Sequence, residues 1–292
     1  MNSAHTRLNL MLTLKLKLDR ISLEIMYNTF VLPTMEYAII VWGGAYDSDM
    51  CKLERIHVDG MRLITGATAR SNIAKLFVET GFTPVKQHYE NAALVMMYKI
   101  KHSLVPNYLT DLIPLQNCDY VNYNLRNNQD IKVPFTRLES FRRSFIPNAI
   151  HMWNNLSIEV KESPSISLLK KVLKPALSEA NVIYYYGYRW TAVHHTRMRL
   201  GCSKLNYDLC FNLHVSNNPA CICQAKFETA KHYLIECPLY TRQRITLRAT
   251  VEQHGIFNIQ TLLFGDKNLS VEENLAIFGA VHAYIVDTKR FV

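Results

Sequence analysis

The sequence predicts a mainly α-helical fold that ends in a small, α-rich module held by a metal ion. Three observations predict it. Glycine and proline, which punctuate strand hairpins, number only 10 each in 292 residues. Apolar residues recur at helical spacing along most of the chain. Three cysteines and one histidine gather within 17 positions near the C-terminal end, and these side chains are the usual ligands of structural zinc.

Six helices are predicted in the first part of the chain, at residues 8–18, 22–30, 33–42, 48–64, 73–80 and 85–102. Leucines at every second position from Leu8 to Leu18 favour a strand by their spacing. Leucine, methionine and lysine are strong helix formers, however, so a helix is predicted there. Ser71 is expected to be the N-cap of the helix at 73–80, and Gly81 to end it. The helix at 85–102 carries a stripe of tyrosine, alanine and methionine that indicates core packing.

The middle and last parts of the chain continue the helical pattern after an asparagine-rich connection at 114–134. A short helix is predicted at 106–113, and a longer one at 137–156 that Pro147 splits. A linker with three consecutive tyrosines is expected at 181–187. The remaining helices are predicted at 164–177, 190–200, 207–213, 227–236, 241–254 and 271–286.

The cluster near the C-terminal end has the spacing C-x-C-x8-H-x4-C, formed by Cys221, Cys223, His232 and Cys237. Four protein ligands leave no open position for an activated water, so the zinc is expected to be structural and not catalytic. A single residue, Ile222, separates the first two cysteines, which makes a tighter turn than the usual pattern. The alternative is a set of buried, reduced cysteines beside a histidine on a helix surface.

Composition indicates a globular intracellular protein of the nucleus or cytoplasm. The chain is 49% hydrophobic and 20% charged, and its length is that of about two domains. Seven cysteines, an odd number, indicate a reducing compartment. No segment reaches the roughly 18 uncharged apolar residues of a membrane span, and the N-terminal stretch has no signal-peptide pattern. No membrane partner is expected.

The net charge of +9 fits a polyanionic partner, usually nucleic acid. Three clusters combine cations that contact phosphates with side chains on which bases stack. The candidate residues are Arg137, Arg142 and Arg143 in the first cluster, Arg189, Trp190, His195, Arg197 and Arg199 in the second, and Arg242 and Arg244 in the third. Each cluster also fits a solvated basic face, and Trp190 also fits a core anchor.

Several motifs follow one another in a characteristic order. Residues 32–43 read LPTMEYAIIVWG, 52–55 read KLER and 62–66 read RLITG. Further on, the chain reads RLESFRRSFIP at 137–147, WNNL at 153–156, RMRLG at 197–201 and CPLY at 237–240. In this order they resemble the C-terminal portion of reverse transcriptases encoded by non-LTR (LINE-like, jockey-like) retrotransposons.

The resemblance implies three regions. They are a helical thumb-like region at 1–114, a connector with a basic helix at 115–180, and a C-terminal helical region at 181–292 with a zinc-knuckle-like segment at 221–237. Such polymerases hold two Mg²⁺ ions through paired aspartates, and this sequence contains no adjacent Asp-Asp pair. The resemblance therefore implies a fragment of an RNA-directed DNA polymerase that lacks the catalytic palm and a Mg²⁺ site of its own.

Such a fragment is expected to bind RNA or an RNA–DNA hybrid, to take no small-molecule substrate and to be no enzyme by itself. A polymerase with a non-standard site is a second hypothesis, which the missing aspartate pair opposes. A third is a co-opted or decaying remnant whose helices bind another protein or have no function.

Overall fold

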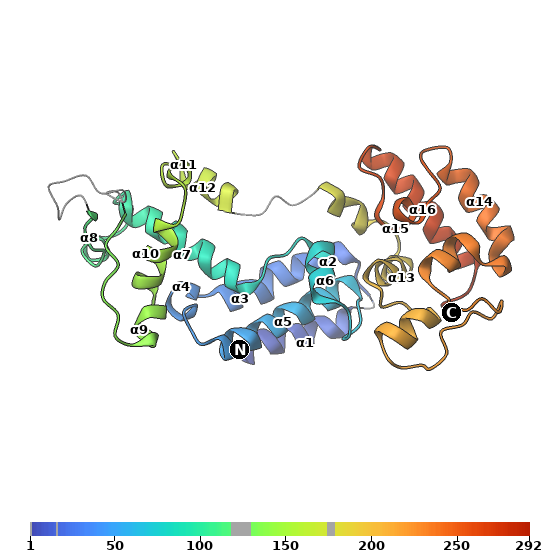
Figure 1. Ribbon diagram of the computed structural model, residues 1–292, viewed down its shortest axis with the longest axis horizontal. Helices are drawn as coiled ribbons and strands as arrows, with labels where there is room; N and C mark the ends of the chain where they lie inside the picture. Colours follow the sequence, from blue (N-terminus) through green and yellow to red (C-terminus); the bar gives the residue numbers. More distant parts are fainter. Residues whose placement is uncertain (1, 16, 118–129, 174–178) are drawn as a thin grey trace. The chain divides into compact units, whose positions relative to one another are not determined.

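The computed structural model describes residues 2–15, 17–117, 130–173 and 179–292, which form helices joined by turns (Figure 1). These residues contain no strand, only one isolated antiparallel bridge between Gln116 and Ile131. The prediction of a mainly α fold is therefore confirmed. Most of the asparagine-rich stretch lies outside the described residues. Within the described part, no helix has the length and apolar character needed to cross a membrane.

The chain folds into two compact units whose segments alternate along the sequence. Unit 1 comprises residues 32–57 and 83–176, and unit 2 comprises residues 2–31, 58–82 and 177–292. Helix α5, Asp47–Thr65, gives its first part to unit 1 and its second part to unit 2. This division differs from the regions expected at 1–114, 115–180 and 181–292. Two segments of the first hundred residues pack with the C-terminal part of the chain, so the units are not consecutive.

Unit 1 is built around α7, Val85–Lys101, which packs against α10, Phe145–Asn154, and α12, Ile166–Leu173. Trp153 lies buried between these helices. A Cβ on Gly43 would lie 2.1 Å from the Tyr89 ring, so glycine allows the close approach of its segment to α7. The other helices of unit 1 are α3, Leu32–Glu36, α4, Ile39–Trp42, α8, Asn107–Thr110, α9, Glu139–Arg143, and α11, Ile158–Lys161.

The core of unit 2 lies between α14, Thr241–Val251, and α16, Val271–Asp287, with α13, Arg189–Leu200, packed on α16. Buried aromatic rings fill it, among them Tyr233, Phe278 and Tyr284. The other α-helices are α1, Asn2–Leu14, α2, Arg20–Met26, α6, Ile73–Thr80, and α15, Ile259–Phe264. Within its described residues, unit 2 also has short turns of 3-10 or π type: η1, Tyr27–Val31, η3, Glu179–Tyr185, η4, Asp208–Asn212, η5, His232–Glu236, and η6, Pro238–Tyr240.

Helix α6 begins and ends as predicted, but its N-cap is Asn72 and not Ser71, since the Asn72 side chain accepts from Lys75 N–H. The helix expected at 33–42 breaks at Ala38, which has a left-handed backbone with φ of 52°. The helix expected at 137–156 breaks at Ser144, whose ψ of 164° is extended. Pro147 instead lies in the first turn of α10, where a missing N–H costs no hydrogen bond.

Candidate metal centre

The four predicted metal ligands come together in unit 2. One ligand atom from each of Cys221, Cys223, His232 and Cys237 lies within 4.8 Å of the other three. Cys221, His232 and Cys237 are buried, and Cys223 is partly exposed. The first two residues lie in a loop, His232 begins the π-turn η5, and Cys237 follows its end. The side chains are therefore positioned to bind one metal ion together.

Two distances between ligand atoms can be compared with those of a tetrahedral zinc site. Two thiolates each 2.3 Å from a zinc ion lie about 3.8 Å apart in a tetrahedron, and the Sγ atoms of Cys221 and Cys237 are 3.8 Å apart. Cys223 Sγ lies 3.2 Å from His232 Nε2, against about 3.6 Å for a sulfur and a nitrogen on one zinc. These two distances are therefore close to those of a tetrahedral site, and all four ligand atoms lie within 4.8 Å of one another.

A tight turn brings the first two cysteines to the same ion. The Gln224 N–H donates to the Cys221 carbonyl over 2.9 Å, and the Cys221 N–H donates to the Ala225 carbonyl over 3.0 Å. Gln224 has a φ of 72°, in the left-handed region, and this reverses the chain directly after the second cysteine. Ile222 is 82% exposed at the tip. The single spacer is thus compatible with chelation, because its side chain points away from the cluster.

The last two ligands are held by the backbone of η5 and by Arg244. The Cys237 N–H donates to the His232 carbonyl over 2.7 Å, which fixes the spacing of these two ligands. Arg244 donates to the carbonyls of Leu234, over 3.0 Å, and Cys237, over 2.6 Å. The helix expected at 227–236 is therefore replaced by a loop, a short helical start at Ala230 and the π-turn.

Without a metal ion, the surroundings hold two of the three thiols in the neutral form. Burial raises the pKa of the Cys237 thiol to about 12 and raises that of Cys221 as well. A hydrogen bond from the Ala225 backbone lowers the pKa of Cys223. A divalent ion would convert all three thiols to thiolates. Because all four positions come from side chains, such a site would stabilise the fold and leave no position for a reacting water.

The loop that carries Cys221 is fastened to the C-terminal segment by residues that the sequence patterns did not indicate. Arg290 donates twice to the buried carboxylate of Glu228, with both distances 2.7 Å. The Asn206 amide donates to the Ala220 carbonyl over 2.6 Å. These partners lie 62 and 14 positions apart in the chain, so no local spacing connects them.

The first predicted basic cluster lies in unit 1 and is partly neutralised. Arg142 pairs with Glu139 at 2.7 Å. Arg143 pairs with Glu139 at 3.0 Å and with Asp47 at 3.2 Å. Arg137 is exposed. Two of the three guanidiniums are therefore engaged with carboxylates, which reduces the positive potential of this face.

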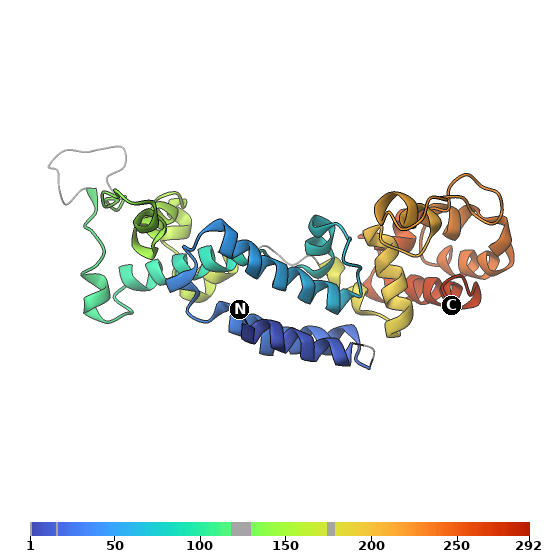
Figure 2. The ribbon, with the colours of Figure 1, turned by 90° about the horizontal axis from the view of Figure 1, so that it is seen from below.

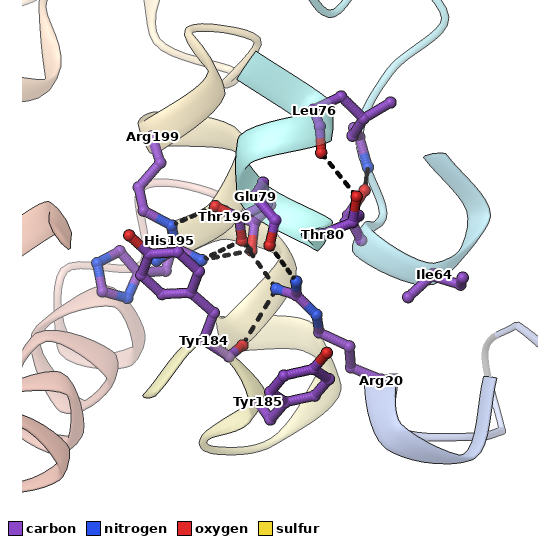
Figure 3. A network of polar contacts seen from close by, with 12 residues as sticks. Arg20, Ile64, Leu76, Glu79, Thr80, Tyr184, Tyr185, His195, Thr196 and Arg199 are labelled. Carbon is purple, nitrogen blue, oxygen red and sulfur yellow. Dashed lines mark hydrogen bonds and ion pairs between the residues drawn. The ribbon is translucent and has the colours of Figure 1, made fainter. Parts of the chain in front are cut away.

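Arg199, of the second cluster, is buried in an ion-pair network with Glu79 and Arg20 (Figure 3). Its Nε and one terminal nitrogen donate to the two Glu79 oxygens over 3.0 and 2.8 Å. Arg20 donates to the same carboxylate over 2.8 Å and to the Tyr184 carbonyl over 3.2 Å. The Arg199 guanidinium also stacks 4.2 Å from the centre of the Tyr184 ring. Arg199 thus stabilises the core of unit 2 and is not exposed to a ligand.

The other members of the second cluster differ in their positions. His195 is 1% exposed and bonds through Nε2 to the Leu262 carbonyl over 2.9 Å. Trp190 packs partly buried against the core. Arg189 donates to the Ile64 and Leu63 carbonyls, and Arg197 to the Gly66 carbonyl over 2.8 Å. The two arginines satisfy carbonyls at the end of α5, which helical hydrogen bonds leave open.

In the third cluster, Arg242 is exposed, whereas Arg244 is partly buried beneath the metal ligands. Of the predicted nucleic-acid contacts, Arg199 and His195 are buried, Arg244 supports the metal cluster, and Arg189 and Arg197 cap a helix.

Comparison of the chain with family models, curated proteins and solved structures gives no match.

Proposed function

We propose that the chain is a nucleic-acid-binding module whose C-terminal part is held by one structural zinc ion. The observation that carries the proposal is the cluster of Cys221, Cys223, His232 and Cys237, with ligand atoms within 4.8 Å of one another. A closed set of three thiols and one imidazole is a structural site. It would hold a zinc-knuckle-like segment, and a segment of this kind grips a partner and performs no reaction.

Two observations support nucleic acid as the partner. The net charge of +9 favours a polyanion. The ordered motifs resemble the thumb, connector and cysteine–histidine tail of retrotransposon reverse transcriptases, which implies RNA or an RNA–DNA hybrid as the ligand. The proposal assigns no chemical step and no Mg²⁺ site to this chain, as expected for a polymerase fragment without the palm.

A filter-binding titration with single-stranded RNA, at low and at high salt, tests the binding function. We expect binding at low salt that weakens as salt rises, because cations on the protein replace counterions condensed on the phosphates. Absence of binding at low salt, or binding that does not depend on salt, would contradict the proposal.

The alternative, a co-opted or decaying remnant that binds another protein, has one observation in its favour. A groove of about 480 Å³ in unit 2 is lined mainly by apolar side chains, among them Ile21, Ile25 and Val182. Ile25 and Val182 are each 57% exposed. An Ile25→Asp variant that binds RNA normally but loses a protein partner would favour this alternative.

A further inference from the structure

A second groove in unit 2, of about 750 Å³, is lined by residues in or next to α1, the second half of α5 and α13. Figure 2 shows the ribbon of these helices from below. Most of the ionisable side chains that line it are basic. They are Lys15, Arg62, Arg189, Arg197 and Lys204. Among the described residues that line the groove, Asp59 is the one carboxylate, and it already pairs with Arg62 over 3.0 Å. The groove therefore carries a strong excess of positive charge.

The cations of this groove retain donors for a ligand. Lys15 and Lys204 are exposed, and neither ammonium has an ion-pair partner within the described part of the chain. Arg197 donates through Nε to the Gly66 carbonyl, and a guanidinium has further N–H groups on its two terminal nitrogens. Fixed by that hydrogen bond, Arg197 presents these nitrogens with little loss of conformational entropy.

Two buried polar atoms of lining residues have no partner. His194 is 4% exposed, and its Nδ1 makes no hydrogen bond within the described residues. The Nε of Arg62 is also buried, with no hydrogen-bond partner in the part of the chain that the structure describes. Unpaired buried polar atoms are uncommon in proteins, and a water or ion can be the missing partner. Burial, together with the charges of Arg197 and Lys204, lowers the pKa of His194 to about 4, so this imidazole is neutral at pH 7.

Aromatic side chains accompany these cations. Tyr188 lines the groove and is 79% exposed. Trp190 lies edge-on to the His194 ring with centroids 4.6 Å apart, and His194 stacks on Phe291 at 4.5 Å. Cations that contact phosphates and an exposed ring on which a base stacks are the features of single-strand binding sites. The volume is that of a small-ligand site, which suits part of a flexible strand better than a rigid duplex.

We propose that this groove binds single-stranded nucleic acid, with phosphates at Lys15, Arg197 and Lys204 and a base stacked on Tyr188. The inference rests on the proposed function and specifies its site. Lys15 directly follows α1 and Arg197 lies in α13, so the groove exists only where the N-terminal segment packs in unit 2. Lys15, Tyr188 and Lys204, which the variants below replace, are all exposed, so these changes are expected to leave the fold intact.

The test measures binding of a fluorescent single-stranded oligouridine, and of an RNA duplex of equal length, to the full chain by anisotropy. The double variant Lys15→Gln, Lys204→Gln loses two phosphate contacts. Since each contact contributes roughly 0.7 to the slope of log affinity against log salt, the magnitude of the slope is expected to fall by about 1.4. Tyr188→Ala is expected to weaken binding roughly tenfold without changing this slope. Lys170→Gln with Lys171→Gln removes the same charge from exposed positions of α12 and is expected to leave the slope unchanged.

A second measurement needs no variant. Photo-cross-linking of a 4-thiouridine oligonucleotide to the wild-type chain is expected to label the peptide that contains Tyr188. The inference is overturned if wild-type protein binds RNA but the groove variants bind like the wild type, if the duplex binds more tightly than the single strand, or if the cross-link falls elsewhere. In those cases the proposed function stands. If the wild-type chain binds no RNA, both fail.

Discussion

At the scale of single residues, Glu79 shows how this chain uses charge. Its carboxylate lies between two buried guanidiniums (Figure 3). Burial alone would raise the pKa of Glu79, but Arg199 and Arg20 together lower it below its usual value. Sequence patterns placed Arg199 among surface cations because no local spacing reveals a partner 120 positions away. The same reason explains why His195 was expected at a surface and lies in the core.

The Glu79→Gln variant is expected to lose roughly 3 kcal/mol of unfolding free energy, since it leaves two buried guanidiniums without a counter-charge. Urea unfolding followed by circular dichroism measures the loss. Glu159→Gln, at an exposed position of α11, is the control and is expected to change stability by less than about 0.5 kcal/mol. Equal effects of the two changes would show that the network contributes no special stability.

His194 provides a test of pH dependence. Its pKa is about 4 in the folded chain, against an ordinary 6.5, because it is buried near Arg197 and Lys204. Between these pH values the unfolded chain binds a proton that the folded chain does not. Stability from this group is therefore complete above about pH 6.5 and is lost as pH falls towards 4. His282 has a pKa of about 4 for the same main reason, burial, and acts in the same direction.

The His194→Phe variant is expected to unfold with a flatter pH dependence between pH 6.5 and 4.5, by up to about 1.4 kcal/mol per pH unit. The ring can keep its stacking on Phe291, and Nδ1 has no hydrogen bond to lose. Urea unfolding of both proteins at four pH values measures the difference. Parallel curves for variant and wild type would refute this assignment.

At the scale of elements, periodicity and capping residues predicted most helices. Helix α6 has the predicted bounds because Gly81 ends it in a left-handed conformation. Helix α15 was not expected because six residues are too few for a periodic signal. The π-turns depend on tertiary packing and on the metal segment, which local propensity does not contain.

The contact between α5 and α13 gives the prediction at this scale. Arg197→Ala is expected to cost about 1 kcal/mol, because the Gly66 carbonyl at the end of α5 loses its donor. Amide hydrogen exchange is expected to become faster in the last turn of α5, as measured by mass spectrometry. Arg242→Ala, at an exposed position beside the metal segment, should leave both quantities unchanged. Unaltered exchange in α5 of the Arg197 variant would contradict the capping role.

At the scale of the whole molecule, the sequence predicted the helical class but not the two units. Each unit combines segments that are distant in the chain, such as residues 58–82 and 177–292 in unit 2. Arrangements of this kind depend on contacts like that between Arg20 and Glu79, which no short pattern encodes. The clustering of Cys221, Cys223, His232 and Cys237 was predictable, because the four residues lie within one short segment at a spacing typical of zinc ligands. The ion pair of Glu228 and Arg290, which fastens the loop that carries Cys221, was not predictable, because the two residues are distant in sequence.

The most direct test of the central claim is native mass spectrometry of the chain purified without added metal. We predict a mass that corresponds to one zinc ion per chain and the loss of three protons from the cysteine thiols. The Cys237→Ser variant is expected to bind no zinc. The control variant Cys51→Ser, which changes an exposed cysteine outside the cluster, is expected to keep the ion. A strong chelator should remove the ion and lower the melting temperature. A metal-free wild-type chain that keeps its melting temperature in the chelator would contradict the claim.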